Sequence, residues 1–305
     1  MTSPFGPLTA IADPRALGGR LRDALPLLER TLKELDLEHT IVLAEEPGEA
    51  TRIASEALRG GARYLVAVGD DRTVQDVVNG MFADGRPLVE DAVLGVVPCG
   101  SASDLVLSFG LPDDTEGACR HLTGTNTYPF DVMKVTTRSG AGEPVTRYAA
   151  NLAEVGMGAE VVRRRVGRTS NGGRFRAFWG GWLHGRPHPV TVQADNKSWE
   201  GKAFNVIVGN GQFAGGLRMS PRSFPGDGVL DALVFSGPRS DAYTMLPRIY
   251  RHGDHIPDPN IQELRAKIRI AVDADRPLTV AADGVPFGNT PATFQVVPQQ
   301  ISLKL

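Results

Sequence analysis

Residues 64–80 read YLVAVGDDRTVQDVVNG, and this stretch decides the fold class of the N-terminal half. The uninterrupted apolar run Tyr64–Val68 is typical of a strand that is buried on both faces, as in a parallel sheet. The spacing of apolar residues over Val74–Phe82 predicts a helix. The stretch therefore predicts a strand-turn-helix unit, and in open parallel sheets such turns, at the carboxyl ends of strands, are where ligands bind.

The flanking sequence repeats the same alternation. Upstream, residues 20–37 place leucines and alanines three and four residues apart, which predicts an amphipathic helix. A short strand, His39–Leu43, and a helix, Gly48–Arg59, follow it. Downstream, Ala92–Pro98 has the composition of a second buried strand, and a Gly/Ser turn joins it to a helix over Asp104–Phe109. This order predicts an α/β domain built on a parallel sheet.

After about residue 128 the pattern changes. The chain then offers short β-branched segments separated by Gly, Pro, Asn and Asp, which is typical of antiparallel strands. These segments are Tyr128–Thr137, Val145–Val155, Pro189–Gln193, Ala203–Gly209, Val229–Ser236, Lys267–Val272, Leu278–Ala281 and Thr293–Val297. One expected helix, Asp241–His252, interrupts them. We therefore expect an α/β domain over residues 1–130 and a β-rich domain over residues 131–305, whose last strand is free to pack back on the first domain.

Composition excludes several classes of protein. The chain has 305 residues, 41% hydrophobic and 22% charged, which indicates a globular protein of about two domains. Its net charge of -2 provides no global attraction to nucleic acid or to an anionic membrane. Two cysteines are too few for a disulfide framework and favour a reducing compartment, so we expect a cytoplasmic location. No apolar run is long enough to span a bilayer, and the histidines lack zinc-site spacing.

Two turns carry the candidate chemistry. The first, residues 69–73 (GDDRT), follows Tyr64–Val68, and the second, residues 98–104 (PCGSASD), ends the strand Ala92–Pro98. A tight strand-to-helix turn directs backbone N–H groups toward the helix N-terminus, which favours an anion there. Each turn alone also has the composition of an ordinary helix start with an N-cap. The occurrence of both turns together therefore carries the functional hypothesis.

Five segments together resemble the diacylglycerol kinase family, which includes bacterial lipid kinases, sphingosine kinases and ceramide kinases. Residues 69–81 (GDDRTVQDVVNGM) resemble its GGDGT and LNEVVNGL signature, and residues 94–112 (LGVVPCGSASDLVLSFGLP) resemble LGIIPLGTGNDFARSLGLP. Residues 151–158 resemble the N-x-x-x-x-G-x-G element, residues 225–231 resemble SDGLLD, and residues 282–286 resemble DGEP. The segments follow the family's order and extend from about residue 9 to the C-terminus.

The resemblance implies an N-terminal three-layer nucleotide-binding domain, a C-terminal antiparallel β-sandwich and an active site in the cleft between them. The implied reaction transfers the γ-phosphoryl group of ATP, with Mg²⁺, to a lipid hydroxyl. The implied nucleotide contacts are Gly69, Asp71, Arg72, Thr73, Gly100, Ser101 and Asp104. The implied catalytic acids are Asp71 and Asp283, and the implied structural Mg²⁺ ligands are Asp227 and the backbone oxygens around Phe224 and Val229.

Three departures from the family's pattern argue against ordinary kinase activity. Asp70 and Arg72 replace two glycines, and a side chain there removes the positive φ and the close approach to phosphate that glycine permits. Val285 stands where the family carries its glutamate base, and valine cannot accept a proton, so Asp283 would have to substitute. A milder departure is Asp13, which stands where the family has asparagine before Pro14.

Three functions stay open at this stage. The chain is an ATP-dependent lipid kinase if it is active. The alternative is a catalytically inactive or repurposed member that binds a hydrophobic ligand in the interdomain cleft and needs no nucleotide or metal. An activity like that of NAD kinases, which share the GGDGT-type turn, is a distant third.

A basic segment, Arg163–Arg186, predicts peripheral contact with an anionic membrane. It contains seven arginines, no Asp or Glu, and four interleaved aromatic residues. The arginines are Arg163, Arg164, Arg165, Arg168, Arg174, Arg176 and Arg186, and the aromatics are Phe175, Phe178, Trp179 and Trp182. The aromatic spacing is equally typical of a buried helix face. We expect a hydrophobic or lipid ligand and no nucleic acid partner, and the sequence leaves a homodimer open.

Overall fold

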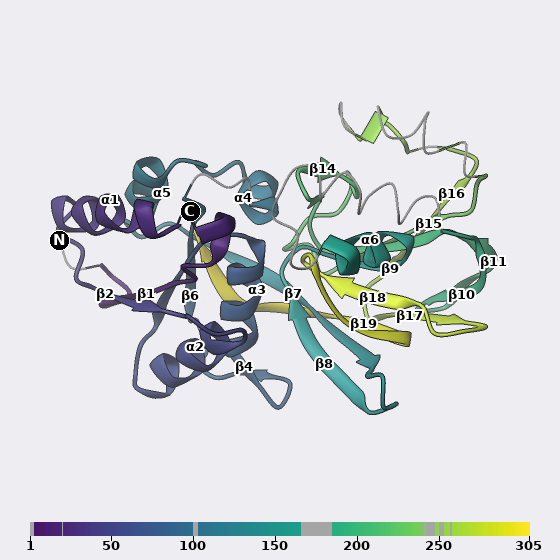
Figure 1. Ribbon diagram of the computed structural model, residues 1–305, viewed down its shortest axis with the longest axis horizontal. Coiled ribbons are helices and arrows are strands. Elements are labelled where there is room, and N and C mark those ends of the chain that lie inside the picture. Colours follow the sequence, from purple (N-terminus) through teal and green to yellow (C-terminus); the bar gives the residue numbers. More distant parts are fainter. Residues whose placement is uncertain are drawn as a thin grey trace. The chain divides into compact units, whose positions relative to one another are not determined.

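The computed structural model describes residues 3–305 apart from residues 20, 100–102, 166–184, 239–240, 242–247, 250–252 and 257. The chain divides into two compact units. The first comprises Met1–Asp131 and Pro298–Leu305, and the second comprises Val132–Val297. The last strand, β19 (Val285–Lys304), therefore contributes residues to both units, and it is labelled at the yellow end of the colour scale in Figure 1.

The first unit is built on a sheet of parallel strands. Their order is β2 (His39–Leu43), β1 (Leu8–Ala12), β3 (Tyr64–Val68), β6 (Val93–Val97) and the end of β19. All five residues of β3 and of β6 are buried, which is why both strands are continuous apolar runs in the sequence. The carboxyl ends of β1, β3 and β6 lie side by side, because Ala12 pairs with Val68 and Val68 pairs with Val97.

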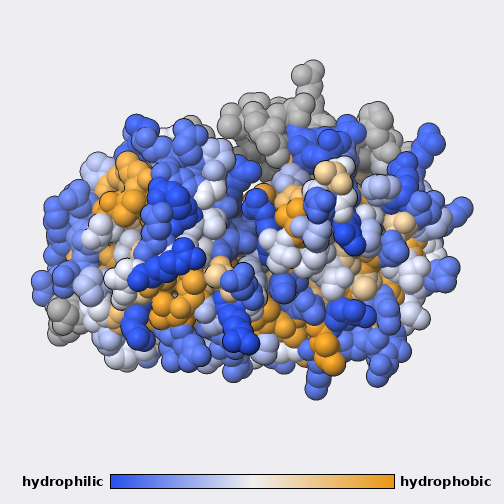
Figure 2. Space-filling view, turned by 90° about the horizontal axis from the view of Figure 1, so that it is seen from below, coloured by the Kyte–Doolittle hydropathy of each residue, from blue (hydrophilic) through white to orange (hydrophobic). Residues whose placement is uncertain are grey.

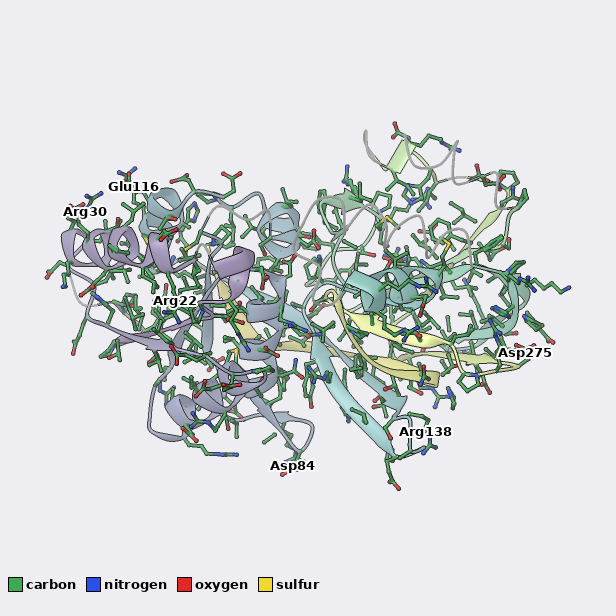
Figure 3. All side chains as sticks on the ribbon, in the orientation of Figure 1. Arg22, Arg30, Asp84, Glu116, Arg138 and Asp275 are labelled. Carbon is green, nitrogen blue, oxygen red and sulfur yellow. The ribbon has the colours of Figure 1, made fainter. Side chains whose placement is uncertain are left out.

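Helices cover both faces of this sheet, so the unit has three layers (Figure 1). The helices are α1 (Leu21–Glu34), α2 (Glu49–Arg59), α3 (Asp71–Gly80), α4 (Asp104–Phe109) and α5 (Thr115–His121), with a short 3-10 turn over Ala16–Gly19. Apolar residues of α1 and α5 share one core cluster with alternate residues of β1, β3 and β6. Arg30 of α1 and Glu116 of α5 lie next to each other at the surface, with Nη2 of Arg30 3.9 Å from Oε1 of Glu116 (Figure 3). A two-stranded hairpin, β4 (Phe82–Ala83) with β5 (Arg86–Pro87), follows α3.

The second unit is rich in antiparallel strands. They are β7 (Thr127–Arg138), β8 (Pro144–Ala149), β9 (Leu152–Gly156), β10 (His188–Ala194), β11 (Lys197–Ala203), β12 (Asn205–Gly209), β13 (Phe213–Ala214), β14 (Leu217–Arg218), β15 (Leu230–Phe235), β16 (Ile261–Ala266), β17 (Arg269–Ala274), β18 (Thr279–Ala282) and most of β19. One series of paired strands runs β16-β15-β12-β9-β18-β19. A second series, β11-β10-β17, is joined to β19 by the pairing of β17 with β19. One helix, α6 (Met157–Arg165), lies against β9 and β18.

A large apolar cluster joins most of these strands, and a smaller one, of Leu152, Ile207 and Leu233, packs on β9, β12 and β15. Buried residues from both series contribute to the large cluster, among them Val155 of β9, Val192 of β10, Val206 of β12 and Phe294 of β19. The alternation of buried and exposed residues along β10 fits a strand with one face on this core. The mixed α/β first unit and the β-rich second unit confirm the expected fold class.

The structure corrects several element boundaries. The expected strand Val145–Val155 is two strands, β8 and β9, because the backbone turns at Ala150–Asn151. The expected strand Lys267–Val272 begins only at Arg269, since Lys267 and Ile268 form the turn after β16. Helix α3 begins at Asp71, three residues before the expected start. Most of the expected helix Asp241–His252 lies outside the described residues.

The surface is mainly hydrophilic. Figure 2 shows one face, on which apolar side chains gather only in small separate patches among hydrophilic ones. Among the described residues, the large hydrophobic side chains that are exposed are Leu43, Leu107, Phe224 and Ile268. In that same part of the chain no helix combines the length and apolar character needed to cross a membrane.

Candidate functional site

The turn after β3 depends on a glycine at its first position. Gly69 is buried and has a φ of 151°. A Cβ at this position would collide with Oγ1 and Cβ of Thr73, one turn into α3. Thr73 is itself completely buried, so it cannot move away. Gly69 therefore lets the first turn of α3 pack directly on the end of β3.

Asp70 closes the N-terminus of α3. It is the N-cap residue, and its Oδ1 accepts hydrogen bonds from the backbone N of Thr73 (3.2 Å) and from Thr73 Oγ1 (3.3 Å). An acidic N-cap satisfies a backbone donor that the helix cannot satisfy and places a negative charge at the positive end of its dipole. The residue that replaces a family glycine thus occupies donors that a bound anion would use.

Asp71 links the two turns that the sequence singled out. Its Oδ1 accepts hydrogen bonds from Ser103 Oγ and from the backbone N of Asp104, each at 2.8 Å. Ser103 is the N-cap residue of α4 but makes no capping bond of its own, so the Asp71 carboxylate caps α4 instead. The structure therefore brings Asp71, Thr73 and Asp104 together, whereas Gly100 and Ser101 lie outside the described residues.

Arg72 is not part of this network. Its side chain is exposed, and within the described part of the chain it forms no hydrogen bond and no ion pair. Thr73 and Asp76 are buried and Asp71 is partly buried, so the guanidinium of Arg72 is the most accessible charged group in the first turn of α3. Arg72 is therefore available to an anion that approaches from solvent.

A charge pair that the sequence did not predict lies at the carboxyl end of β1. Asp13 is 5% exposed, and its Oδ1 and Oδ2 accept from Arg15 Nε (2.9 Å) and from Arg15 NH2 (2.8 Å). The hydrogen bond to Asp13 raises the pKa of Arg15 despite partial burial, and the charges of Glu46 and Asp76 act in the same direction. Arg15 is therefore held by carboxylates of its own unit.

Asp283 is bound to backbone amides of the second unit. Its Oδ2 accepts from the backbone N of Ala150 (2.6 Å), and its Oδ1 accepts from those of Asn151 (3.0 Å) and Leu152 (2.9 Å). Its own backbone N donates to the carbonyl of Leu152 at 2.8 Å. Asp283 thus holds the break between β8 and β9 against the turn before β19. These contacts support a structural role, and the assignment of Asp283 as a base stays a prediction.

The glycines of the N-x-x-x-x-G-x-G element serve close packing at the start of α6. A Cβ at Gly156 would approach the carbonyl oxygen of Phe204 to 2.8 Å. The backbone N of Gly158 donates to Asn205 Oδ1 at 3.0 Å. Asn151, the first residue of the element, donates from Nδ2 to the carbonyl of Phe213. Sequence reasoning missed Asn205, because its partner lies 47 residues away.

The donor set expected for a structural Mg²⁺ is satisfied by protein groups. Asp227 Oδ1 accepts from the backbone N of Val229 (3.0 Å), and Asp227 Oδ2 lies 3.5 Å from NH2 of Arg265. The carbonyl of Phe224 accepts from the backbone N of Gly226 at 2.9 Å. No group of three or more His, Cys, Asp or Glu among the described residues has the arrangement of a metal site. The assignment of Asp227, Phe224 and Val229 to a structural Mg²⁺ stays a prediction.

Arg265 supplies a positive charge at this place. Its Nε donates to Oδ1 of Asp231 at 2.7 Å, and Oδ2 of Asp231 accepts from Ser223 Oγ at 2.8 Å. Burial raises the pKa of Asp231, although the hydrogen bond from Ser223 and the charge of Arg265 act to lower it. The guanidinium thus contacts one buried and one partly exposed carboxylate, and it supplies positive charge where a metal ion could otherwise supply it.

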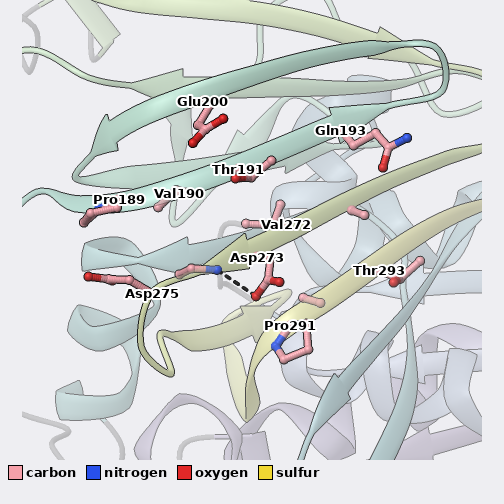
Figure 4. A pocket seen from close by; sticks show the side chains of 13 residues that line it. Pro189, Val190, Thr191, Gln193, Glu200, Val272, Asp273, Asp275, Pro291 and Thr293 are labelled. Carbon is pink, nitrogen blue, oxygen red and sulfur yellow. Dashed lines mark hydrogen bonds between the residues drawn. The ribbon is translucent and has the colours of Figure 1, made fainter.

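A groove of about 540 Å³ lies elsewhere in the second unit. Side chains of β10, β17 and β19 line it, among them Thr191, Asp273 and Thr293 (Figure 4). The dashed line in Figure 4 is the bond that the backbone N of Ala274 donates to Asp273 Oδ1 at 2.8 Å. None of the residues in the family motifs lines this groove, so it is separate from the candidate site.

The arginine-rich segment is described only at its ends. Arg163 and Arg164 form ion pairs with Glu160 of α6, each at 2.7 Å. Residues 166–184, which hold three of the seven predicted membrane-contacting arginines and all four aromatics, lie outside the described residues. The membrane contact of this segment stays a prediction.

Comparison with known proteins gives the family. The diacylglycerol kinase catalytic domain matches residues 7–135, and the YegS C-terminal NAD kinase beta sandwich-like domain matches residues 182–305. The "Probable lipid kinase YegS" of Salmonella newport is 26% identical over 306 residues, which cover 95% of this chain and 94% of the relative. The "Probable lipid kinase YegS-like" of Klebsiella pneumoniae is 24% identical over 298 residues, with 94% and 91% covered.

Solved structures show the same fold. A diacylglycerol kinase from Bacillus anthracis has a TM-score of 0.72 at 21% identity, covering 99% of this chain and 97% of its own. Yeast NADH kinase has a TM-score of 0.55 at 10% identity, covering 97% and 82%. The family resemblance that the motifs indicated is confirmed. With matches over residues 7–135 and 182–305, the chain belongs to the diacylglycerol kinase catalytic-domain family and carries a YegS-type C-terminal domain.

Proposed function

We propose that this chain is a non-catalytic member of its family that binds a lipid-type hydrophobic ligand without using ATP. The observation that carries the proposal is the contact of Asp70, whose carboxylate accepts hydrogen bonds from Thr73 N and Thr73 Oγ1. In a phosphate-binding turn the free donors at the helix N-terminus face the phosphate. Here the carboxylate of Asp70 occupies these donors in place of a phosphate.

Electrostatics supports the same conclusion. A phosphate that entered the turn would lie beside the carboxylate of Asp70, which replaces a glycine of the family's pattern. Two unit charges about 4 Å apart repel by about 4 kcal/mol at the effective dielectric near a protein surface, which corresponds to roughly a thousandfold in affinity.

A reversion experiment tests whether the three substituted positions silence the kinase. We expect no transfer of the γ-phosphoryl group of ATP to diacylglycerol in mixed micelles by the parent protein. The triple variant Asp70→Gly, Arg72→Gly, Val285→Glu should gain measurable transfer. Asp84→Gly is the matched control, because Asp84 is an exposed turn aspartate with a φ of 50° outside the candidate site (labelled in Figure 3). Parent activity of about 1 s⁻¹, within the range of kinases, would contradict the proposal.

An active ATP-dependent lipid kinase is the second candidate. The accessible guanidinium of Arg72 favours it, since arginine binds phosphate well. If this candidate is correct, Arg72→Gln weakens ATP binding strongly, while Arg86→Gln, an exposed arginine of β5, leaves it unchanged. NAD⁺ tried as the acceptor in the same assay tests the NAD kinase-like alternative.

The lipid ligand is inferred from family membership, because the curated relatives carry the names of lipid kinases. Solvent extraction of the purified protein followed by mass spectrometry should yield a lipid in about equimolar amount. Recovery of no lipid, together with no binding of fluorescent lipid analogues by the extracted protein, would contradict this half of the proposal. Size-exclusion chromatography with light scattering tests the homodimer that the sequence left open.

A further inference from the structure

The turn between β16 and β17 exposes an isoleucine at its tip. Ile268 is 71% exposed, which is the largest value among the exposed large hydrophobic side chains of the described residues. It follows Ala266, which is 2% exposed, and precedes Ile270, which is fully buried. The apolar side chain at position 268 is therefore excluded from the core on which its neighbours pack.

This turn is held rigidly by one carboxylate. Asp195, in the turn between β10 and β11, accepts hydrogen bonds from the backbone N of Lys267 (2.8 Å), Ile268 (3.2 Å) and Arg269 (2.9 Å). The backbone N of Asp195 donates in return to the carbonyl of Arg269 at 3.0 Å. Ile268 thus projects from a preformed turn, and little conformational freedom remains to be lost when it binds something.

Cations surround the exposed isoleucine. Lys197, Lys267 and Arg269 are exposed, and within the described part of the chain none of the three forms an ion pair. The one carboxylate among them is Asp195. Burial acts to raise its pKa, but the three backbone amides outweigh burial and lower it, so Asp195 is ionised at neutral pH. Three cations against one carboxylate leave a local positive charge on a chain whose net charge is -2.

We propose that these residues, Lys197, Lys267, Ile268 and Arg269, form a basic tip that docks the protein on an anionic lipid bilayer. The cations would bind lipid phosphates, and Ile268 would enter the boundary between headgroups and acyl chains. A projecting aliphatic side chain needs no complementary pocket in a fluid bilayer, whereas a protein partner would have to offer one. The chemistry therefore favours a lipid surface over an acidic protein.

A second exposed apolar side chain lies toward the same end of the sheet. Leu230 at the start of β15 pairs with Ala266 at the end of β16, so the loop before β15 and the basic tip follow the same end of this strand pair. That loop contains Phe224, which is 40% exposed. Phe224 is thus a candidate second anchor in a loop that adjoins the same strand pair, and a second anchor matters because a single small one gives only marginal binding.

The docking proposal goes beyond the proposed function and does not depend on it. It requires no nucleotide, no catalysis and no ligand in the candidate site, and it concerns residues that the family motifs do not include. An active kinase and an inactive lipid binder would both need access to a bilayer. Vesicle binding and ATP binding can therefore succeed or fail separately.

Sedimentation with vesicles tests the proposal. We expect the full chain to bind vesicles of phosphatidylcholine with about 30% phosphatidylglycerol at low salt and to bind pure phosphatidylcholine vesicles much more weakly. Lys267→Gln should weaken partitioning about fivefold and Ile268→Ser about tenfold. The matched controls are Lys202→Gln, an exposed lysine near the other end of β11, and Leu43→Ser, an exposed leucine of the first unit; neither should change binding.

A fluorescent probe reports insertion directly. Cys99 and Cys119 are both buried, so an Ile268→Cys variant can be labelled selectively with an environment-sensitive dye. Its emission should shift to the blue with anionic vesicles and stay unchanged with a soluble acidic polypeptide such as polyglutamate. Equal vesicle binding by parent, Lys267→Gln and Ile268→Ser would overturn the proposal. So would a parent that does not bind, or a dye that responds to polyglutamate and not to vesicles.

Discussion

Removing the Asp283 carboxylate distinguishes a structural residue from a catalytic base. In Asp283→Ala the backbone amides of Ala150, Asn151 and Leu152 lose their acceptor. These three residues are 2%, 4% and 3% exposed, so water has little access to replace the carboxylate. A buried donor left without a partner costs roughly 1–2 kcal/mol, and the three together predict a loss of about 3–6 kcal/mol in stability.

Backbone conformation adds a smaller effect that a control can remove. Asp283 has a φ of 43°, which alanine adopts less easily than aspartate. Asp84 has a φ of 50° in the β4–β5 turn and forms no hydrogen bond among the described residues, so Asp84→Ala reports the conformational cost alone. We expect Asp84→Ala to lower the free energy of unfolding by about 1 kcal/mol. Asp283→Asn keeps one oxygen acceptor, so its loss of stability should lie between those of the two alanine variants.

Urea unfolding and hydrogen exchange measure this prediction together. Urea gives the free energy of unfolding, and exchange of the peptide over residues 150–152 reports whether these amides lose protection in Asp283→Ala. A loss within about 1 kcal/mol of the Asp84→Ala control, with protection of residues 150–152 unchanged, would refute the structural role. Asp283 would then again be a candidate for the base.

Three further predictions follow from buried or paired groups. Burial raises the pKa of Cys119 to about 12 and also raises that of Cys99, so both thiols should resist alkylation in the native state. The folded pKa of Cys119 lies above its unfolded value of about 8.5, so the stability that its protonated thiol adds is fully present below pH 8 and is lost as pH rises. Relative to Cys119→Ala, thermal melts of the parent should show about 1 kcal/mol less stability at pH 10 than at pH 9. Since Arg265 supplies the positive charge beside Asp227, EDTA should leave the melting temperature unchanged, whereas Arg265→Ala should cost about 2–4 kcal/mol; a melting temperature lowered by EDTA in the parent would contradict this. Gly69→Ala should also destabilise, by about 2 kcal/mol or more, because its Cβ would strike the buried Thr73, and calorimetric melting checks it.

Most elements of the first unit were predictable because they are specified locally, but the strand β1, the β4–β5 hairpin and the helix α5 were missed. The apolar runs of β3 and β6 and the helical spacing of α1 identify buried parallel strands and a covering helix without any long-range information. In the second unit β11 and β16 were missed. Both alternate apolar residues with charged ones, for example in KSWEGKA and IQELRA, and such short alternations are hard to separate from loops.

The contacts that decide the site could not be read from the sequence. Asp71 caps α4 through residues 32 and 33 positions away, and Asp283 binds amides 131–133 positions away. Motif spacing identifies these aspartates but gives no information on which donors they meet. Asp70 is the exception, since its partner Thr73 is three residues away, as in an ordinary N-cap. That bond was available to sequence reasoning, which noted the N-cap composition of the turn but weighed Asp70 as the loss of a glycine.

Calorimetric titration of the purified parent protein with ATP, with and without Mg²⁺, tests the central claim most directly. Because Asp70 already occupies the donors of Thr73, we predict no binding heat up to about 1 mM ATP in the parent and measurable binding in the Asp70→Gly, Arg72→Gly variant. Binding of ATP by the parent with a Kd near 1 μM, unchanged in the variant, would contradict the account.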